Sequence, residues 1–321
     1  MRVSRGGFVC ALHEIPAQQF AGFVDCFKPA QPVPLSDLVR RCKDGKSIRG
    51  LFSITVDDGV GDNVRALARL FLARQWPATF YLPTQYVETG EGMAFQWWRN
   101  LKPHLPRRKL ELRSRFLDLS PAGAVEALSK RMETLWHSQP QETYFPLIRE
   151  LIEVVERERG IVRAALQPSP PISWAEAYQL SRTDLIRFES HGVTHTAMSA
   201  LTEAELLREL RHSRDLVSER CGYPCRHLAY PFGSPLSIGT MASAAAKLFY
   251  DSAATMTSYG GDVDRADPWL LPRIPLYASN SRLSAWLKTR LRYSRAGLRR
   301  GESPSAAEGS GGATVVCTSD R

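Results

Sequence analysis

Short apolar runs that stop abruptly at polar or turn residues recur along most of this chain, and they constrain its fold more than any other feature. Several of them lead into stretches with helical periodicity, such as residues 63–75 and 203–220. Strands that alternate with helices indicate an α/β fold with a largely parallel sheet. The predicted strands are residues 8–12, 51–56, 78–82, 186–190, 227–230, 248–253 and 270–276.

Local signals place the ends of two helices. The helix over 203–220 is preceded by Thr202 and has Glu205 three residues later, the spacing of a capping box. The helix before residue 75 is expected to begin near Asp62 or Asn63, since either side chain is a good N-cap.

The alternation of strands and helices is interrupted between about residues 91 and 171 by a charge-rich segment with helical periodicity and no strand pattern. We interpret it as a helical insertion within one catalytic domain that spans residues 1–280. Residues 281–300 are predicted to form a basic amphipathic helix. Residues 301–321 are rich in Ser, Gly and Ala and predict a disordered tail.

Composition narrows the class of protein. The chain has 321 residues, enough for one large domain or two smaller ones, and its net charge of +9 is far from a histone-like excess. We therefore expect no nucleic-acid partner. No run of about 18 apolar residues is present, and the apolar stretch near the N-terminus breaks at His13 without a cleavage site, which predicts a cytoplasmic protein.

Two adjacent carboxylates, Asp57 and Asp58, directly follow the predicted strand 51–56. In a strand-loop-helix unit of a barrel, catalytic groups collect at this end of the strand. An ordinary Asp-Gly turn is the alternative, because Gly59 comes next.

His191 and His195 are four residues apart after another predicted strand. They are not the zinc-binding helix of a metalloprotease, because Gly192 stands where that motif needs a glutamate. In a loop, two imidazoles this close can bind one ion if a third ligand arrives from elsewhere. Two ordinary structural histidines are the alternative.

The stretch AYPFG, residues 229–233, follows a third predicted strand. Pro231 fixes one backbone angle and Gly233 permits unusual ones, so this loop could direct a backbone N–H into a site.

Taken in order, TVDDG (55–59), SHGVTH (190–195) and AYPFG resemble the first three motifs of the polysaccharide deacetylases, the NodB-homology or carbohydrate esterase family 4 group. The resemblance covers about residues 8–278. It implies a distorted (β/α) barrel and a metal-dependent enzyme that removes N-acetyl groups from sugars.

The resemblance also implies roles for individual residues. Asp58, His191 and His195 would bind one divalent metal, Zn²⁺ in the first place, with Co²⁺ or Ni²⁺ accepted by the same ligands. Asp57 would be the general base. The backbone N–H of Phe232 would stabilise the oxyanion, and its neighbours Tyr230 and Pro231 would line the substrate site.

Two departures from the family pattern affect the mechanism. Ala229 stands where the third motif commonly carries the arginine that orients the base, and Arg273 in LPRIP is our substitute, as in a variant subgroup with AYPFG-like motifs. The late histidine that supplies the general acid is missing. His13 is the replacement candidate, and a packing role at the barrel mouth is its alternative.

The expected substrate is an N-acetylated amino sugar in a polysaccharide or a lipid-linked glycan intermediate. Trp97 and Trp98 could stack on sugar rings, although core packing is the alternative for both. Helix 282–300 could rest on an anionic membrane surface at the inner face of the membrane, or dock on the barrel. A deformylase or amidohydrolase acting on a related bond, and an inactive glycan-binding pseudoenzyme, are the competing functions.

Overall fold

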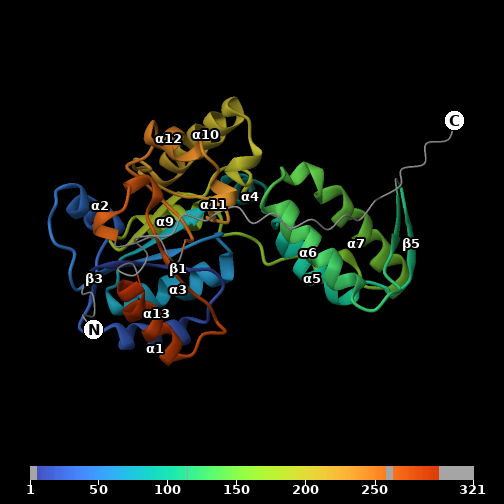
Figure 1. Cartoon of the computed structure of the whole chain (residues 1–321), viewed down its shortest axis with the longest axis horizontal. Coiled ribbons are helices and arrows are strands. Elements are labelled where there is room, and N and C mark those ends of the chain that lie inside the picture. Colours follow the sequence, from blue (N-terminus) through green and yellow to red (C-terminus); the bar gives the residue numbers. More distant parts are fainter. Residues whose placement is uncertain (1–5, 114, 258–262, 296–321) are drawn as a thin grey trace, which may run out of the picture.

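The computed structural model describes residues 6–113, 115–257 and 263–295 of the chain. They form a large α/β body and a smaller, mainly helical lobe that projects from it (Figure 1). The lobe is built from the insertion, so one continuous stretch of chain leaves the body and returns to it.

An eight-stranded parallel sheet forms the centre of the body, as the alternating pattern predicts. The strand order is β10-β1-β3-β4-β7-β8-β9, with β2 paired to β3, and the sheet curves into a half-barrel. Their bounds are β1 Phe8–Leu12, β2 Gln31–Pro32, β3 Leu51–Val56, β4 Ala78–Leu82, β7 Ile186–Ser190, β8 His227–Ala229, β9 Ser252–Ala254 and β10 Ile274–Leu276.

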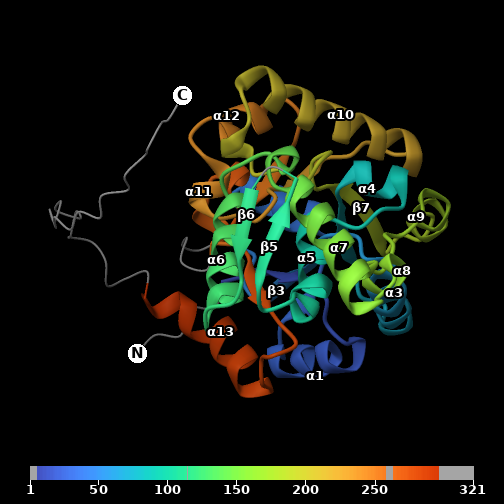
Figure 2. The same ribbon diagram turned by 90° about the vertical axis from the view of Figure 1, so that its right-hand side faces the viewer.

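Helices cover this sheet (Figures 1 and 2). They bury its apolar side chains. The helix α10 begins at the predicted capping box, where Thr202 accepts from the N–H of Glu205. The bounds of these helices are α1 Ala17–Phe27, α2 Leu35–Lys43, α3 Gly61–Arg74, α4 Thr84–Thr89, α9 Trp174–Ser181, α10 Glu203–Cys221, α11 Pro235–Ile238, α12 Ala242–Lys247 and α13 Arg282–Arg295.

Strand register brings the predicted chemical groups together. Val56 of β3 lies opposite Leu12 of β1 and Phe80 of β4, and Ser190 of β7 lies opposite Leu228 of β8. The carboxyl ends of these parallel strands therefore meet at one edge of the half-barrel. The loops that follow them are the loops that carry the motifs.

Three local predictions were wrong. The start of α3 is not capped by Asp62 or Asn63, because the helix begins at Gly61 and the Asn63 amide instead donates to the carbonyl of His13 at 2.5 Å. The strand expected over 248–253 begins at Ser252, since α12 runs on to Lys247. The strand expected over 270–276 begins at Ile274, because a 3₁₀ turn occupies Pro268–Leu270.

The lobe, which faces the viewer in Figure 2, has a hydrophobic core of its own. Its helices are α5 Ala94–Leu101, α6 Ala124–Trp136, α7 Phe145–Arg159 and α8 Arg163–Leu166. The prediction that it contains no strand was wrong: β5 Lys109–Leu112 and β6 Arg115–Asp118 form an antiparallel hairpin. In β5, Leu110 and Leu112 are buried while Lys109 and Glu111 are exposed, which is the period of a strand with one face on the core.

The basic helix α13 packs against α1 and buries Ala285. Its predicted last residues, 296–300, and the tail predicted to be disordered, 301–321, lie outside the described residues. None of the described helices combines the length and apolarity that a membrane-spanning segment needs.

Candidate active site

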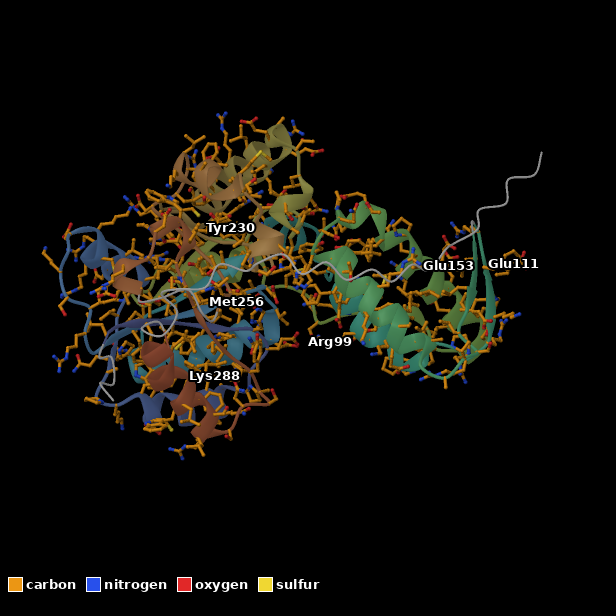
Figure 3. All side chains as sticks on the ribbon, in the orientation of Figure 1. Arg99, Glu111, Glu153, Tyr230, Met256 and Lys288 are labelled. Carbon is orange, nitrogen blue, oxygen red and sulfur yellow. The ribbon has the colours of Figure 1, made fainter. Side chains whose placement is uncertain are left out.

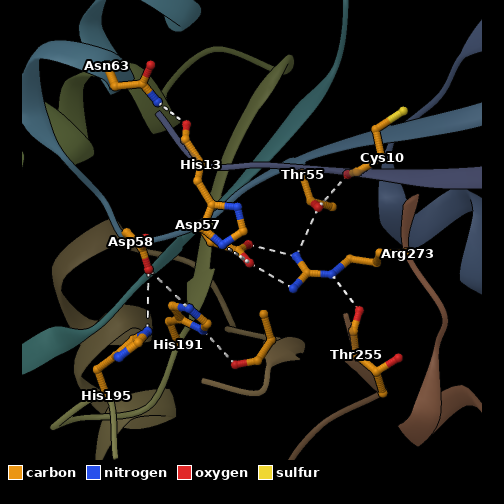
Figure 4. Close-up of polar contacts among 11 residues, drawn as sticks. Cys10, His13, Thr55, Asp57, Asp58, Asn63, His191, His195, Thr255 and Arg273 are labelled. Atoms are coloured by element: carbon orange, nitrogen blue, oxygen red, sulfur yellow. Dashed lines mark hydrogen bonds and ion pairs between the residues drawn. The ribbon is translucent and has the colours of Figure 1, made fainter. Parts of the chain in front are cut away.

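The turn after β3 presents two carboxylates in different directions. Asp57 continues the β1 pairing, since its N–H donates to the carbonyl of Leu12 at 2.8 Å. Asp58 has a left-handed backbone with φ of 72°, which turns the chain sharply. The next residue, Gly59, has φ of 63°, and a Cβ there would lie 2.7 Å from the side chain of Leu82. The two side chains therefore serve two different sets of partners (Figure 4).

Asp58, His191 and His195 form a buried cluster of potential metal ligands. Asp58 Oδ1 lies 3.5 Å from His191 Nε2 and 3.4 Å from His195 Nε2 (Figure 4). Two ligands that are each about 2.1 Å from a tetrahedral zinc ion are about 3.4 Å apart. The spacing of these atoms fits one shared divalent ion better than it fits short direct hydrogen bonds.

The tautomer of His191 is fixed by its backbone partner. Its Nδ1 lies 2.7 Å from the carbonyl of Ala229, so Nδ1 carries the hydrogen and the lone pair of Nε2 faces Asp58. Burial alone would raise the pKa of the Asp58 carboxyl, but the close imidazoles of His191 and His195 outweigh burial and hold its pKa well below the usual value. Burial lowers the pKa of His195, whereas the carboxylates of Asp58 and Asp57 outweigh burial and raise the pKa of His191. Ionised carboxylate and neutral imidazole are the forms that bind metal.

The segment from His191 to His195 is a loop, as predicted, and a residue that we had not identified holds it. Glu209 of α10 accepts hydrogen bonds from the N–H groups of Val193 at 2.8 Å and Thr194 at 2.7 Å. Burial raises the pKa of Glu209. This role of Glu209 can be seen only in the structure, because in the sequence Glu209 belongs to an ordinary charged helical pattern.

Arg273 binds Asp57 in a bidentate ion pair. Its two terminal nitrogens lie 2.7 and 2.8 Å from the two carboxylate oxygens, and both side chains are buried. The guanidinium also donates to the Thr55 hydroxyl and the Thr255 carbonyl, both at 3.1 Å. Burial by itself would raise the pKa of Asp57, but the charge of Arg273 outweighs it and the pKa lies below its usual value.

His13 lies on the other side of the same carboxylate. Its Nε2 is 3.8 Å from Asp57 Oδ2, and its ring stacks on Tyr277 with centroids 6.4 Å apart. About a third of the side chain is exposed, so the imidazole lies at the mouth of the site. Its Nδ1 is buried and has no hydrogen-bond partner among the residues that the structure describes.

A sequence model of the polysaccharide deacetylases matches residues 44–252, which is more than half of the chain. The chain belongs to the polysaccharide deacetylase family. It is therefore a hydrolase that acts on the C–N bond of N-acetylated sugars. No curated protein sequence gives a significant match to this deacetylase.

Solved structures share the fold of this deacetylase at low sequence identity. Streptococcus pyogenes deacetylase PplD, in complex with acetate, is 11% identical with a TM-score of 0.56, over 90% of this chain and 100% of that one. The deacetylase domain of BpsB from Bordetella bronchiseptica is 11% identical with a TM-score of 0.54, covering 86% and 98%. IcaB from Ammonifex degensii is 13% identical with a TM-score of 0.53, covering 89% and 98%.

The third motif of the deacetylase forms a strained loop beside the ligand cluster. Phe232 has φ of 60°, and its ring lies 4.8 Å from that of His195. Within the described residues no hydrogen bond uses the N–H of Phe232. Tyr230 differs from our prediction, because its ring is fully buried and its hydroxyl donates to the carbonyl of Trp269 at 2.9 Å. Its side chain therefore cannot contact substrate, and Pro231 is buried as well.

The two tryptophans predicted to stack on sugar are not at the site. Trp97 and Trp98 are buried in the core of the lobe, where Trp98 donates to the hydroxyl of Ser129 at 3.2 Å. Core packing, the alternative reading of both residues, is what the structure shows. Phe95 of the same helix instead faces the site, with its ring 5.6 Å from that of His195.

Proposed function

We propose that this deacetylase is a metal-dependent hydrolase that removes N-acetyl groups from an amino sugar in a polysaccharide or a lipid-linked glycan intermediate. One observation carries the proposal: a carboxylate held by a buried arginine, Asp57, lies directly beside three residues spaced for one metal ion. A base and a metal position next to each other are what hydrolysis of an unactivated amide needs.

The ligand set supports Zn²⁺, with Co²⁺ and Ni²⁺ as alternatives, because two imidazoles and one carboxylate leave coordination positions open. Such an ion, when bound, supplies Lewis acidity that lowers the pKa of water from about 15.7 towards 7 and polarises a carbonyl.

Residues of the protein supply the general base and hold it in position. Asp57 accepts the proton of the attacking water, and its lowered pKa keeps it ionised at neutral pH. Arg273 fixes both carboxylate oxygens and so takes the place of the arginine absent at Ala229, as in the proposed AYPFG-type subgroup. This contact removes one of the two grounds for the pseudoenzyme alternative, the missing arginine; the other ground is the missing late histidine.

Two further groups complete the reaction. The N–H of Phe232 donates to the oxygen that becomes negative when the carbonyl is attacked; donors of this kind contribute about 10²- to 10³-fold. His13 holds a proton for the departing amine, because its Nε2 lies next to Asp57 at the open mouth of the site. Acetate and a free amino sugar leave.

Acetate release tests this function. Purified protein loaded with Zn²⁺ should release acetate from N-acetylated amino-sugar oligomers or lipid-linked sugars, and Asp57→Asn should lose this activity. Formate release from N-formyl sugars in place of acetate would favour the deformylase alternative. No release from a broad amide panel would remove the proposal.

We also propose that the enzyme works at the inner, cytoplasmic face of a membrane. Leu283 and Trp286 of α13 are exposed beside the exposed cation Arg282, which is the chemistry of a peripheral contact with anionic lipid. Co-sedimentation with vesicles that contain anionic lipid should fall in Leu283→Glu and with added salt. Equal sedimentation of both proteins would count against this contact.

A further inference from the structure

The lobe places three aromatic side chains against the metal-ligand cluster. The ring of Phe95 lies 5.6 Å from His195, and the ring of Trp136 lies 6.3 Å from Phe95. The next residue, His137, lies 4.7 Å from Phe232, which itself lies 4.8 Å from His195. These contacts link five side chains in one series, from Trp136 through Phe95, His195 and Phe232 to His137, which we call the aromatic collar.

Exposure separates the collar from the core of the lobe. On α5, Trp97 and Trp98 are buried among the lobe's apolar residues, whereas Phe95 is only partly buried. Trp136, at the end of α6, and His137, which follows it, are partly buried as well. The lobe thus leaves aromatic surface partly open where it meets the catalytic site, although Trp136 also packs against the edge of the lobe's core.

Polar contacts hold the collar in place without a ligand. The Nδ1 of His137 lies 2.8 Å from the hydroxyl of Ser237, in the short helix that follows the Phe232 loop. Gln141 accepts a 2.5 Å hydrogen bond from Tyr86 of the body. At the junction, Arg99 of the lobe binds Glu14 of the body, and Figure 3 places Arg99 between the two parts.

Charge also distinguishes this surface. Burial lowers the pKa of His137, which favours a neutral imidazole, and the other lobe members of the collar are uncharged. A neutral aromatic wall suits a neutral ligand with apolar C–H faces and a polar rim. A pyranose ring has that construction, and burying its C–H face on aromatic carbon is favourable.

We propose that the aromatic collar is a carbohydrate-binding subsite supplied by the lobe, in which Phe95 and Trp136 stack on the sugar ring that carries the reacting acetamido group. His137 hydrogen-bonds a hydroxyl of that sugar through Nε2, because Nδ1 is held by Ser237. The choice of a sugar ligand rests on the proposed function, whereas the subsite itself rests on the collar geometry.

Two substrates of different shape test the subsite. Phe95→Ala and Trp136→Ala are compared with wild type on N-acetylhexosamine oligomers and on S-ethyl thioacetate, which has an acetyl group and no ring. The ratio of the kcat/KM values for oligomer and thioester should fall roughly 3- to 10-fold in each variant, through a higher KM for the oligomer. Phe116→Ala is the matched control, since Phe116 is an exposed aromatic of the same lobe, on its hairpin.

Binding without turnover gives a second readout. Titrating the oligomers into Asp57→Asn should change its tryptophan fluorescence, and Trp136→Phe in the same background should remove most of that change. An unchanged substrate ratio in both alanine variants, or an unchanged fluorescence response without Trp136, would overturn the subsite. If the oligomers bind but wild type releases no acetate from them, the proposed function fails while the subsite stands.

Discussion

Replacing Arg273 by methionine leaves the carboxylate of Asp57 buried without its counter-charge. Methionine keeps much of the length of the arginine side chain, but it loses the two hydrogen bonds of 2.7 and 2.8 Å to Asp57. It also loses the bonds to Thr55 and the Thr255 carbonyl. Because both partners are buried, solvent cannot take the place of the guanidinium.

The expected cost is about 3–5 kcal/mol of unfolding free energy, the range for removing one partner of a buried ion pair. The cost depends on pH. In wild type the lowered pKa of Asp57 contributes stability that is present above its unfolded value and lost as pH falls through the folded value. Without Arg273, burial raises the pKa, so the carboxyl takes up a proton on folding. The variant should therefore lose more stability at pH 8 than at pH 4.

Urea unfolding at both pH values measures this difference, and kcat/KM against pH measures its consequence for catalysis. The acid limb of the profile should move to higher pH in Arg273→Met, and the rate near pH 7 should fall by roughly 10²- to 10⁴-fold. Adding Asp57→Asn should restore part of the stability, because it removes the unpaired charge.

Arg187→Met is the matched control. This half-buried arginine donates to backbone carbonyls at the end of α9, away from Asp57. A loss of stability in Arg273→Met with the same pH profile as wild type would refute the role of Arg273 in holding the base.

Three further predictions follow from single contacts. His13→Gln should lower kcat on N-acetyl sugars by roughly 10²- to 10⁴-fold. Its kcat on a thioester should fall far less, because a thiolate leaves without needing a proton. Equal losses of kcat on both substrates would rule out proton donation by His13. Gly233→Ala should reduce kcat, because the new Cβ would lie 2.5 Å from the backbone nitrogen of Met256. Gly160 has a similar left-handed backbone but open space around it, so Gly160→Ala should cost only about 1 kcal/mol of stability by chemical denaturation. Burial raises the pKa of Glu189 to about 7, so wild type should lose stability as pH rises from the unfolded pKa of this carboxyl through 7. Urea unfolding at pH 5 and pH 8 measures the loss, and Glu189→Gln should make it smaller by up to about 3 kcal/mol. The same pH dependence in both proteins would contradict the raised pKa of Glu189.

The site residues at the ends of strands could be predicted from the sequence, because each strand is indicated by a short apolar run next to them in the chain. Each apolar run fixes a strand, and parallel strands share one edge for their carboxyl ends. Asp58 and His191 therefore meet although they are far apart in the chain. The family resemblance then supplied roles that a pattern alone does not.

Contacts that depend on packing could not be predicted in the same way. Arg273 was named only as a substitute, since no local pattern shows that a side chain 216 residues away reaches Asp57. The aromatic run 95–98 offered three rings, and which of them faces the site is decided by how α5 lies on the body. The hairpin was missed because charges at Lys109 and Glu111 match a charged helix as well as an exposed strand face.

Metal content measured together with acetate release tests the central claim most directly. Wild type loaded with Zn²⁺ should hold about one ion per chain and release acetate from an N-acetylated amino sugar. Asp57→Asn should keep the ion and lose the activity, whereas His191→Ala should lose both. Wild type that binds no divalent ion, or an Asp57→Asn variant as active as wild type, would contradict the account.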